Sequence, residues 1–438
     1  MKIALVVLDT LRKDAFDEQF EWLPGARFEH AWSTSHWTMP AHASLFTGKY
    51  PSEAGTHAKS EGLHDPDPTL PELLQQAGFT TRAFSANLMV SPPFRFDRGF
   101  DTFDGSWRLN VNSRELIGWT DLSRDTQPGL RGYLEVLRRI LSREYRVLPS
   151  LQRGIQNRLA EVGIESGAVD DGATACLQTL SNARFSDDEF FFINLMEAHA
   201  PYRPPEDYRT ADESSYDEVA ATVGDLAVDS AAVRAAYDDS VRYLADMYKK
   251  VFTILSGQFD YVITIGDHGE LFGEHQSWRH FHGISPELTH IPMVVSGDGL
   301  DSTSNKPASI LDVHRTILDL AGIEAPSRGQ NLLEGLDGRP RLTEFQGLRP
   351  GRIEMMRERG YSEELIARFD RPLAGLAAEG YYGYETVDEW QEDGSPPMVS
   401  PRKSLETLQA ELNRSQHRTD SPDLSQKLQN RLRDLGYA

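Results

Sequence analysis

Five short runs of apolar residues recur along the chain, at positions 2–8, 80–85, 190–195, 261–265 and 291–296. Runs of this length are typical of strands that are buried on both faces of a sheet. Segments with helical spacing separate most of the runs, for example 69–77 and 230–254. Strands that alternate with helices predict an α/β fold, in which a parallel-rich sheet is sandwiched by helices.

The pattern changes near residue 335, and we expect a main domain over 1–335 and a smaller C-terminal α+β unit over 336–438. Inside the main domain, the Arg- and Leu-rich stretch 107–162 predicts a helical insertion that packs on one edge of the sheet. Within the C-terminal unit, we expect charged loops, an antiparallel hairpin and an interrupted terminal helix, over 339–375, 380–390 and 404–435 respectively.

Polar side chains follow four of the five predicted strands. They include Asp9 after the first strand, Asn87 after the second, His199 after the third, and Asp267 with His268 after the fourth. Open parallel sheets bind their ligands outside the carboxyl ends of the strands, so we expect a site there. Asp9, Asp267 and His268 form a candidate metal set, because carboxylates with an imidazole suit Zn²⁺, Mn²⁺ or Fe²⁺ better than Ca²⁺ or Mg²⁺. Asn87 either lines this site or serves only the turn after its strand.

The segment 38–48, Thr-Met-Pro-Ala-His-Ala-Ser-Leu-Phe-Thr-Gly, contains the candidate nucleophile. Pro40 favours the first turn of a helix, and a helix over 42–46 would direct its free N–H groups toward the space that Thr38 faces. Such a helix start is an anion site, and a hydroxyl between an anion site and a metal can act as a nucleophile. The alternative is that Thr38 only caps the helix.

Composition and charge narrow the class of protein. Asp and Glu total 67 against 45 Lys and Arg, and the net charge of −22 argues against a nucleic-acid binder. Only 9 of the 45 basic residues are Lys, which favours a protein of a salt-loving microbe over a merely acidic one. A single cysteine, Cys176, permits no internal disulfide and no cysteine-based metal site.

The lengths of the apolar runs also indicate where in the cell the protein is expected. No run approaches the roughly 18 residues of a membrane span. The N-terminal run ends in Asp9 after a few residues and has no small-residue cleavage site, so it predicts a buried strand and not a signal peptide. We therefore expect a cytoplasmic protein.

The combined motifs resemble the sulfatase branch of the alkaline phosphatase superfamily, over residues 2–333. The family motif has Cys or Ser, any residue, Pro, Ser, Arg, four residues and Thr-Gly, and this chain keeps its register with Thr38, Pro40, His42, Thr47 and Gly48. Segments 7–12, 194–202 and 264–275 are similar to the family's first metal motif, its His-x-Pro-Tyr substrate motif and its second metal motif.

The resemblance implies a role for each matching residue. Asp9, Asp267 and His268 would hold a divalent metal, and Thr38 would be both a ligand and the nucleophile. His199 would contact an oxygen of the transferred group or the leaving group. His282 would take the place of the family's Lys or His on the transferred group, with His280 as a competing candidate.

Several positions depart from the sulfatase pattern. Thr38 cannot become the formylglycine that sulfatases make from Cys or Ser. His42 replaces the motif's Arg, and Thr10 and His268 stand where many sulfatases have Asp and Asn. These changes favour the metal phosphoesterases and phosphotransferases of the superfamily, several of which use Thr as the nucleophile.

The leading hypothesis is therefore a metal-dependent hydrolase of phosphate mono- or diesters in which Thr38 is the nucleophile and His42 helps to orient it or the ligand. The alternatives are a sulfuric ester hydrolase, a phosphoryl-group transferase, and a non-catalytic relative that binds an anion or a glycan. The expected substrate is an anionic ester of a small molecule, a glycan or a lipid headgroup. No feature indicates the oligomeric state.

Overall fold

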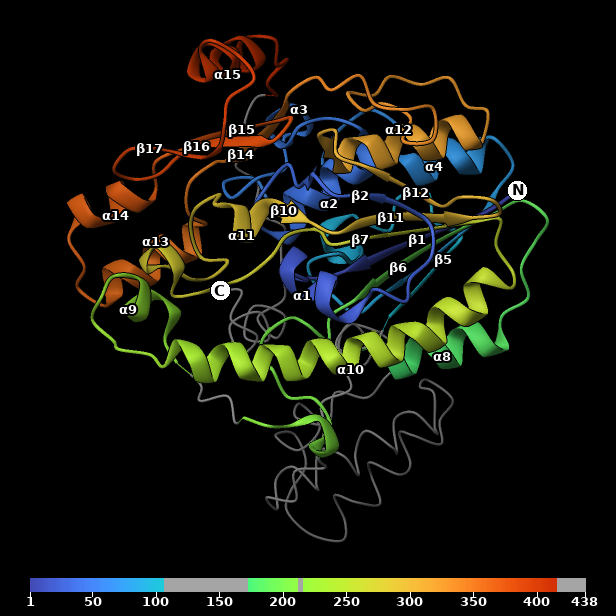
Figure 1. Cartoon of the computed structure of the whole chain (residues 1–438), viewed down its shortest axis with the longest axis horizontal. Helices are drawn as coiled ribbons and strands as arrows, with labels where there is room; N and C mark the ends of the chain where they lie inside the picture. The colour runs from blue at the N-terminus through green and yellow to red at the C-terminus, as the bar shows by residue number, and fades with distance from the viewer. Residues whose placement is uncertain (106–171, 212–215, 416–438) are drawn as a thin grey trace, which may run out of the picture.

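The computed structural model describes residues 1–105, 172–211 and 216–415. Among these residues, eight strands form a central sheet in the order β12-β2-β11-β7-β1-β6-β4-β5 (Figure 1). Their bounds are β1 (Lys2–Leu8), β2 (Ala26–Phe28), β4 (Thr80–Ser85), β5 (Thr102–Gly105), β6 (Glu189–Leu195), β7 (Tyr261–Ile265), β11 (Met293–Gly297) and β12 (Ser302–Ser304). The sheet contains all five predicted strands and confirms the α/β prediction.

One of the predicted strands runs against the others. β11 pairs antiparallel with β7 and β2, whereas all other pairings in the sheet are parallel. The chain returns to the end of β7 before β11 begins: the Gly266 amide just after β7 donates to the Pro292 carbonyl just before β11, 3.0 Å away. β11 therefore starts at the edge where β7 ends and must run back.

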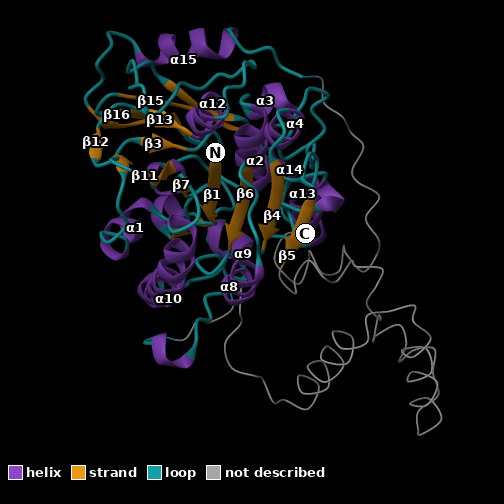
Figure 2. Ribbon diagram, turned by 90° about the vertical axis from the view of Figure 1, so that its right-hand side faces the viewer, coloured by secondary structure: helices purple, strands orange, loops and turns teal. Residues whose placement is uncertain are grey.

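Helices cover both faces of the sheet (Figure 2). One layer contains α1 (Lys13–Gln19), α8 (Ala173–Asn182) and α10 (Ser230–Ser256), and the other contains α2 (Thr38–Thr47), α3 (Pro51–Ala54), α4 (Leu70–Gln76) and α12 (Ile310–Leu320). Side chains of β1 alternate between the layers, because successive residues of a strand point to opposite faces. Leu5 and Val7 pack on the α2 side, and Val6 and Leu8 pack on the α10 side.

Short elements connect the layers and surround the carboxyl ends of the strands. A small sheet has the order β10 (His290–Ile291), β3 (Ala31–Trp32) and β13 (Ala308–Ser309), and β8 (Leu271–Phe272) pairs with β9 (Trp278–Arg279). The remaining pieces are the 3₁₀ turns η1 (Pro92–Phe94), η3 (Glu206–Tyr208) and η4 (Glu274–Gln276), and the helices α9 (Glu218–Thr222) and α11 (Pro286–Thr289). In the part of the chain that the structure describes, no helix is both long and apolar enough to span a membrane.

A separate antiparallel sheet forms the C-terminal unit, with the strands β14 (Arg341–Phe345), β15 (Leu373–Ala378), β16 (Tyr381–Glu385) and β17 (Trp390–Gly394). β16 and β17 confirm the predicted hairpin. The expected loops over 339–375 are wrong, since α13 (Pro350–Glu358) and α14 (Glu363–Phe369) lie between β14 and β15. Each of these helices buries a single side chain completely, Met356 and Ile366, so their apolar pattern is weak.

The last described helix is α15 (Pro401–Ala410), which begins three residues before the helix expected from 404 and overlaps it. The predicted insertion over 107–162 and the end of the predicted terminal helix lie outside the described residues.

Buried polar and aromatic contacts join the C-terminal sheet to the main domain. Arg341 at the start of β14 pairs with Asp312 of α12 at 2.9 Å, and both side chains are at most 2% exposed. The Tyr382 ring of β16 stacks on the Trp32 ring of β3 with their centroids 4.1 Å apart. The C-terminal unit is therefore fixed beside the edge of the central sheet where the parallel strands end.

We expect Arg341→Leu to destabilise the protein by about 3 kcal/mol, because it leaves the buried Asp312 carboxylate without its partner. The matched control is Arg357→Leu in α13, whose ion pair with Glu363 is exposed. This control should change the free energy of unfolding by less than about 1 kcal/mol. Urea unfolding followed by tryptophan fluorescence measures both changes, and equal effects would contradict the prediction.

Candidate metal and nucleophile site

Two adjacent strands of the central sheet, β1 and β7, bring Asp9, Asp267 and His268 together. The register pairs Val7 of β1 with Ile265 of β7, so Asp9 lies beside Asp267 two residues beyond this pair. The ligand atoms of Asp9, Asp267 and His268 all lie within 4.8 Å of one another, and the three side chains are buried. Their convergence follows from the parallel direction of the strands, which end at the same edge.

The two carboxylates of this cluster form a buried like-charge pair. Burial first, and then the negative charge of Asp267, raise the pKa of Asp9 to about 7. Burial likewise raises the pKa of Asp267 to about 7. A positive charge between them would remove both penalties.

Hydrogen bonds satisfy the cluster only in part. The Asn87 amide donates to Asp9 Oδ2 at 2.7 Å, and the backbone amides of Thr10 and His268 donate to Asp267 Oδ1 at 3.1 and 2.9 Å. Asp267 Oδ2 is buried without a hydrogen-bond partner. Such an orphaned carboxylate oxygen beside a second carboxylate fits a bound divalent cation.

His268 presents the nitrogen that a metal requires. Its Nδ1 lies 2.9 Å from the Gly269 carbonyl, which can only accept, so Nδ1 carries the proton and Nε2 has a free electron pair. Burial lowers the pKa of His268 and favours this neutral form. Two carboxylates and a neutral imidazole form a donor set that suits Zn²⁺, Mn²⁺ or Fe²⁺.

Thr38 faces the same cluster from the start of α2. Its Oγ1 lies 3.3 Å from His268 Nε2 and 3.5 Å from the Asn87 amide nitrogen. The helix begins at Thr38 and not at His42, and the N-cap position belongs to Trp37. The alternative in which Thr38 only caps the helix is therefore wrong. The free amides of the first turn of α2 favour an anion in front of the hydroxyl.

The C-terminal end of α2 requires the glycine of the motif. Gly48 has a left-handed φ of 67°, and a Cβ there would lie 2.5 Å from the His314 ring. Both the conformation and the contact favour glycine, so Gly48 stops the helix and lets α12 pack beside it.

His42 contacts Thr38, the candidate nucleophile, and Asn194 contacts His42. His42 Nδ1 donates to the Thr38 carbonyl at 2.9 Å, and His42 Nε2 accepts from the Asn194 amide at 3.2 Å. Burial lowers the pKa of His42 to about 3, so the ring is neutral. His42 therefore positions the backbone of Thr38 and does not supply the positive charge of the Arg that the family motif has there.

Sequence reasoning missed Asn194 and left the role of Asn87 open. Asn194 lies inside the apolar run of β6, on the face that packs against α2, and its amide also donates to Asp9 at 3.3 Å. The sequence did contain a signal for Asn194, since it is a polar residue inside an otherwise apolar strand. Asn87 serves both of its expected roles, because its Oδ1 accepts from the Met89 amide while its Nδ2 reaches Asp9.

A second group of side chains lies beside the cluster. The rings of His199 and His280 have their centroids 5.3 Å apart, and the His280 ring lies 4.8 Å from that of His268. Glu270 accepts from His280 Nδ1 at 2.9 Å and from the Tyr202 hydroxyl at 2.8 Å. Glu270 and Tyr202 therefore hold His280 in place, and this link was not foreseen in the sequence.

The structure separates the two competing histidines. His282 packs edge-on against Phe345 and Phe369, with ring centroids 4.8 and 5.1 Å away, and lines another pocket. Only His280 of the two has its ring against His268 and His199. Of the two candidates, His280 therefore lies beside the cluster and His282 does not, because the irregular chain after β9 turns residues 280 and 282 in different directions.

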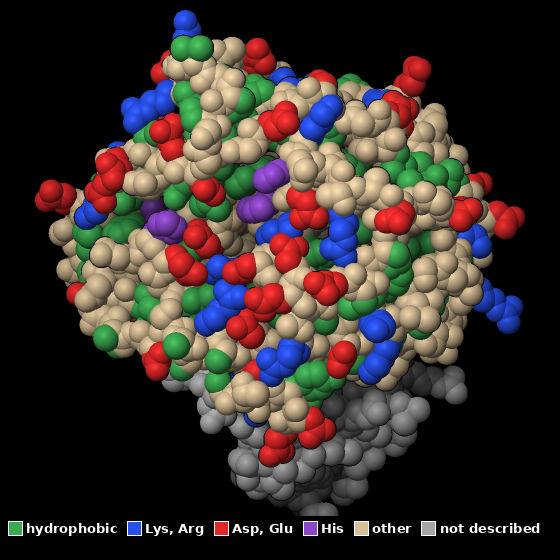
Figure 3. Space-filling model, viewed as in Figure 1, with side chains coloured by type: hydrophobic (Ala, Val, Ile, Leu, Met, Phe, Trp, Pro, Cys, Tyr) green, Lys and Arg blue, Asp and Glu red, His purple; other side chains and the backbone are tan. Residues whose placement is uncertain are grey.

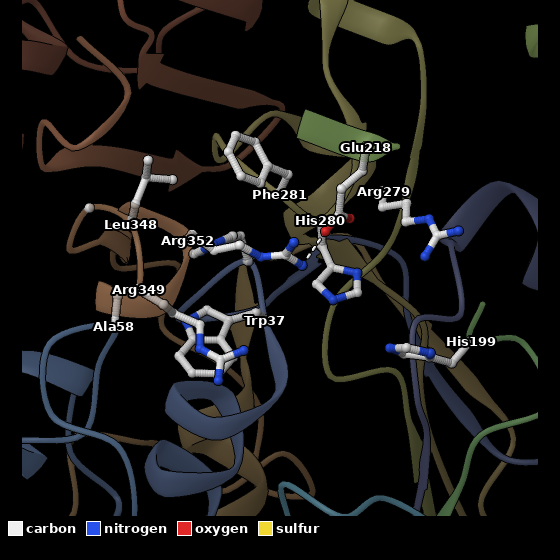
Figure 4. A pocket seen from close by; sticks show the side chains of 12 residues that line it. Trp37, Ala58, His199, Glu218, Arg279, His280, Phe281, Leu348, Arg349 and Arg352 are labelled. Carbon is white, nitrogen blue, oxygen red and sulfur yellow. Dashed lines mark ion pairs between the residues drawn. The ribbon is translucent and has the colours of Figure 1, made fainter. Parts of the chain in front are cut away.

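A pocket opens from His199 and His280 toward the C-terminal unit (Figure 4). It lies beside Trp37, the residue before Thr38, and side chains of α13 close its far side. In the surface view, histidine side chains gather on one face beside a band of mixed acidic and basic side chains (Figure 3). The pocket therefore lies next to the cluster, between the main domain and the C-terminal unit.

Known proteins share this sequence pattern and this fold. The family described as Sulfatase matches residues 19–323, which is more than half of the chain. The "Uncharacterized sulfatase YidJ" of Escherichia coli is 24% identical over 352 residues, which cover 73% of this chain and 66% of that relative. The chain thus spans just under two thirds of that relative's length. The "N-acetylglucosamine-6-O-sulfatase" of Bacteroides thetaiotaomicron is 20% identical, with coverage of 84% and 74%.

Solved structures agree on the fold. The phosphonate monoester hydrolase of Silicibacter pomeroyi superposes with a TM-score of 0.60 and 17% identity, over 99% of this chain and 95% of that chain. The matched residues 19–323 include Thr38, Asp267 and His268 of the cluster. The chain belongs to the sulfatase family.

Proposed function

We propose that this chain is a metal-dependent hydrolase of phosphate mono- or diesters, with Thr38 as the nucleophile. The observation that carries the proposal is the place of the Thr38 hydroxyl, 3.3 Å from His268 Nε2, at the start of α2 and beside the Asp9–Asp267 pair. A threonine there cannot form the formylglycine of the sulfatases, but its hydroxyl can accept a phosphoryl group. The likeness to a phosphonate monoester hydrolase supports a phosphorus ester.

Asp9, Asp267, His268 and Thr38 would hold the cation. When bound, the cation would supply positive charge that lowers the pKa of the Thr38 hydroxyl and offsets charge on the transferring group. Zn²⁺, Mn²⁺ or Fe²⁺ suits this set of donors better than Ca²⁺ or Mg²⁺.

The reaction has two displacements at phosphorus. Thr38 Oγ1 loses its proton and attacks phosphorus, the ester P–O bond breaks, and the alcohol leaves with its electron pair and takes up a proton. Water then attacks the phosphorus of phosphothreonine, which releases the phosphate and returns the proton to Thr38. His42 and Asn194 keep Thr38 in position, and His199 and His280 face the oxygens of the group in transfer.

A sulfuric ester is the second candidate, because the chain belongs to the sulfatase family and one relative is named as a 6-O-sulfatase. The same hydroxyl would then attack sulfur. A panel of an aryl phosphate, a bis-aryl phosphate, an aryl phosphonate and an aryl sulfate separates the candidates. Turnover of the sulfate alone would exclude the phosphoryl reaction.

We expect Asp267→Asn to lower the affinity for the divalent metal by more than roughly 100-fold, since even outer partners of a metal site commonly contribute 10- to 100-fold. The matched control is Asp298→Asn, because Asp298 is exposed after β11, which ends at the opposite edge of the sheet. Metal analysis after dialysis against Zn²⁺ or Mn²⁺ at set free concentrations measures the change. If Asp267→Asn retains metal as tightly as the wild type, the metal site is wrong.

We expect Thr38→Ala to lose roughly 10³-fold or more in kcat while it keeps its metal, because the nucleophile is gone. Thr38→Ser should retain substantial turnover, since it keeps the hydroxyl. Rapid acid quench with mass spectrometry should find a phosphoryl group on the peptide that contains Thr38. Thr253→Ala on the exposed end of α10 is the control and should match the wild type. Undiminished turnover by Thr38→Ala would exclude this nucleophile.

A further inference from the structure

Three arginines line the pocket in front of the cluster. Arg279 comes from β9, and Arg349 and Arg352 come from the start of α13 (Figure 4). Glu218 is the acidic side chain that lines the pocket with them. The whole chain has a net charge of −22, whereas the lining of this pocket contains more basic than acidic side chains. The substrate side of the site is therefore suited to negative charge.

The start of α13 is an unfavourable place for two cations. Arg349 is the N-cap residue and Arg352 lies in the first turn, which contains no acidic residue. The N-terminus of a helix carries partial positive charge, so acidic side chains normally stabilise it. An anion in the pocket would interact favourably with both guanidinium groups and with this helix start. The arrangement is poor for the stability of the free protein and good for binding an anion.

Arg279 also occupies a costly conformation. Its φ of 53° lies in the left-handed region, which side chains other than Gly rarely adopt. Its guanidinium lies over the Tyr216 ring, with Cζ 5.0 Å from the centroid. The fold thus keeps Arg279 in the lining of the pocket although its backbone conformation is unfavourable. Such strained residues are common at binding sites.

Neighbouring groups orient the other two guanidinium groups. Arg349 Nε pairs with Glu61 at 2.6 Å, and its Cζ lies 5.2 Å from the centroid of the Trp37 ring. Arg352 pairs with Glu218, which the dashed line in Figure 4 marks. Both are therefore held in fixed positions, and the planar fork of an oriented guanidinium matches the two oxygens of a carboxylate or phosphate.

The arginines also repel one another. Burial lowers the pKa of Arg352, and the nearby charges of Arg349 and Arg279 lower it further, against the opposing effect of Glu218. An anion bound among them would relieve this repulsion. The pocket lies next to the candidate reaction site, since it is also lined by His280, whose ring lies 4.8 Å from that of His268.

We infer that Arg279, Arg349 and Arg352 form a subsite for a second oxyanion of the substrate. The substrate is then an ester whose alcohol part carries a carboxylate or a further phosphate beside the ester that is cleaved. This inference rests on the proposed function for the identity of the cleaved ester. The subsite itself depends only on the charge and geometry of the pocket.

The first experiment compares three 4-nitrophenyl phosphates whose rings carry a carboxylate, a second phosphate or a neutral carboxamide. We expect the two charged rings to have a kcat/KM about tenfold or more above that of the carboxamide, mainly through KM, because charge-assisted hydrogen bonds contribute about this much. The difference between the carboxylate and the second phosphate identifies which oxyanion fits. The preference should fall as salt is raised.

Arg349→Gln and Arg352→Gln should each remove most of this preference while turnover of the carboxamide substrate stays within about twofold. Arg357→Gln is the matched control, since Arg357 is on the same helix but pairs with the exposed Glu363 outside the pocket. It should keep the full preference. Equal kcat/KM for charged and neutral rings in the wild type, or a preference that survives both pocket variants, would overturn the subsite.

A binding measurement separates this inference from the proposed reaction. Metal-loaded Thr38→Ala is titrated by calorimetry with 3-phosphonopropionate and with its neutral amide. Tighter binding of the carboxylate, lost when Arg352→Gln is added, supports the subsite even if no phosphate ester is turned over. Equal binding of the two ligands overturns it even if Thr38 proves to be the nucleophile.

Discussion

The structure of the site depends on one electrostatic constraint, the burial of two carboxylates in a shared space. Asp9 and Asp267 lie side by side, no lysine or arginine among the described residues forms an ion pair with either, and the pKa of each is raised to about 7. A pair of this kind persists only where the surrounding fold fixes it. The parallel strands β1 and β7 place both residues, and Asn87 and the amides of Thr10 and His268 hold their oxygens. The space between these oxygens could hold a cation.

The same constraint explains why much of the site could be predicted from sequence. Buried strands are visible as local apolar runs, and the end of a run is visible as its first charged or amide residue. Since parallel strands end at one edge of the sheet, the residues at those ends can be grouped as candidates for one site before the order of the strands is known. Asp9, Asn87, Asp267 and His268 could be grouped in this way without knowledge of the sheet order that the structure has.

Long-range packing decides what the sequence could not predict. His280 and His282 stand in one irregular segment, and only the contacts with Glu270 and with Phe345 determine which ring faces the cluster. Asn194 is hidden inside an apolar run, because its partners on β1 and α2 are remote in the sequence. The helices α13 and α14 gave a weak apolar pattern, since they expose most of their surface and fold against the C-terminal sheet.

The C-terminal unit contributes side chains to the pocket but none to the cluster of carboxylates. The proposed metal ligands and the proposed nucleophile come entirely from the main domain, whereas two of the three pocket arginines come from the start of α13. The contacts Arg341–Asp312 and Tyr382–Trp32 fix α13 opposite the cluster without touching it. Substitutions at the start of α13 can therefore alter the charge that the pocket selects while the buried carboxylates, and the chemistry that they support, stay unchanged. The residues proposed to select the substrate and the residues proposed to react thus lie in different parts of the fold and meet at one pocket.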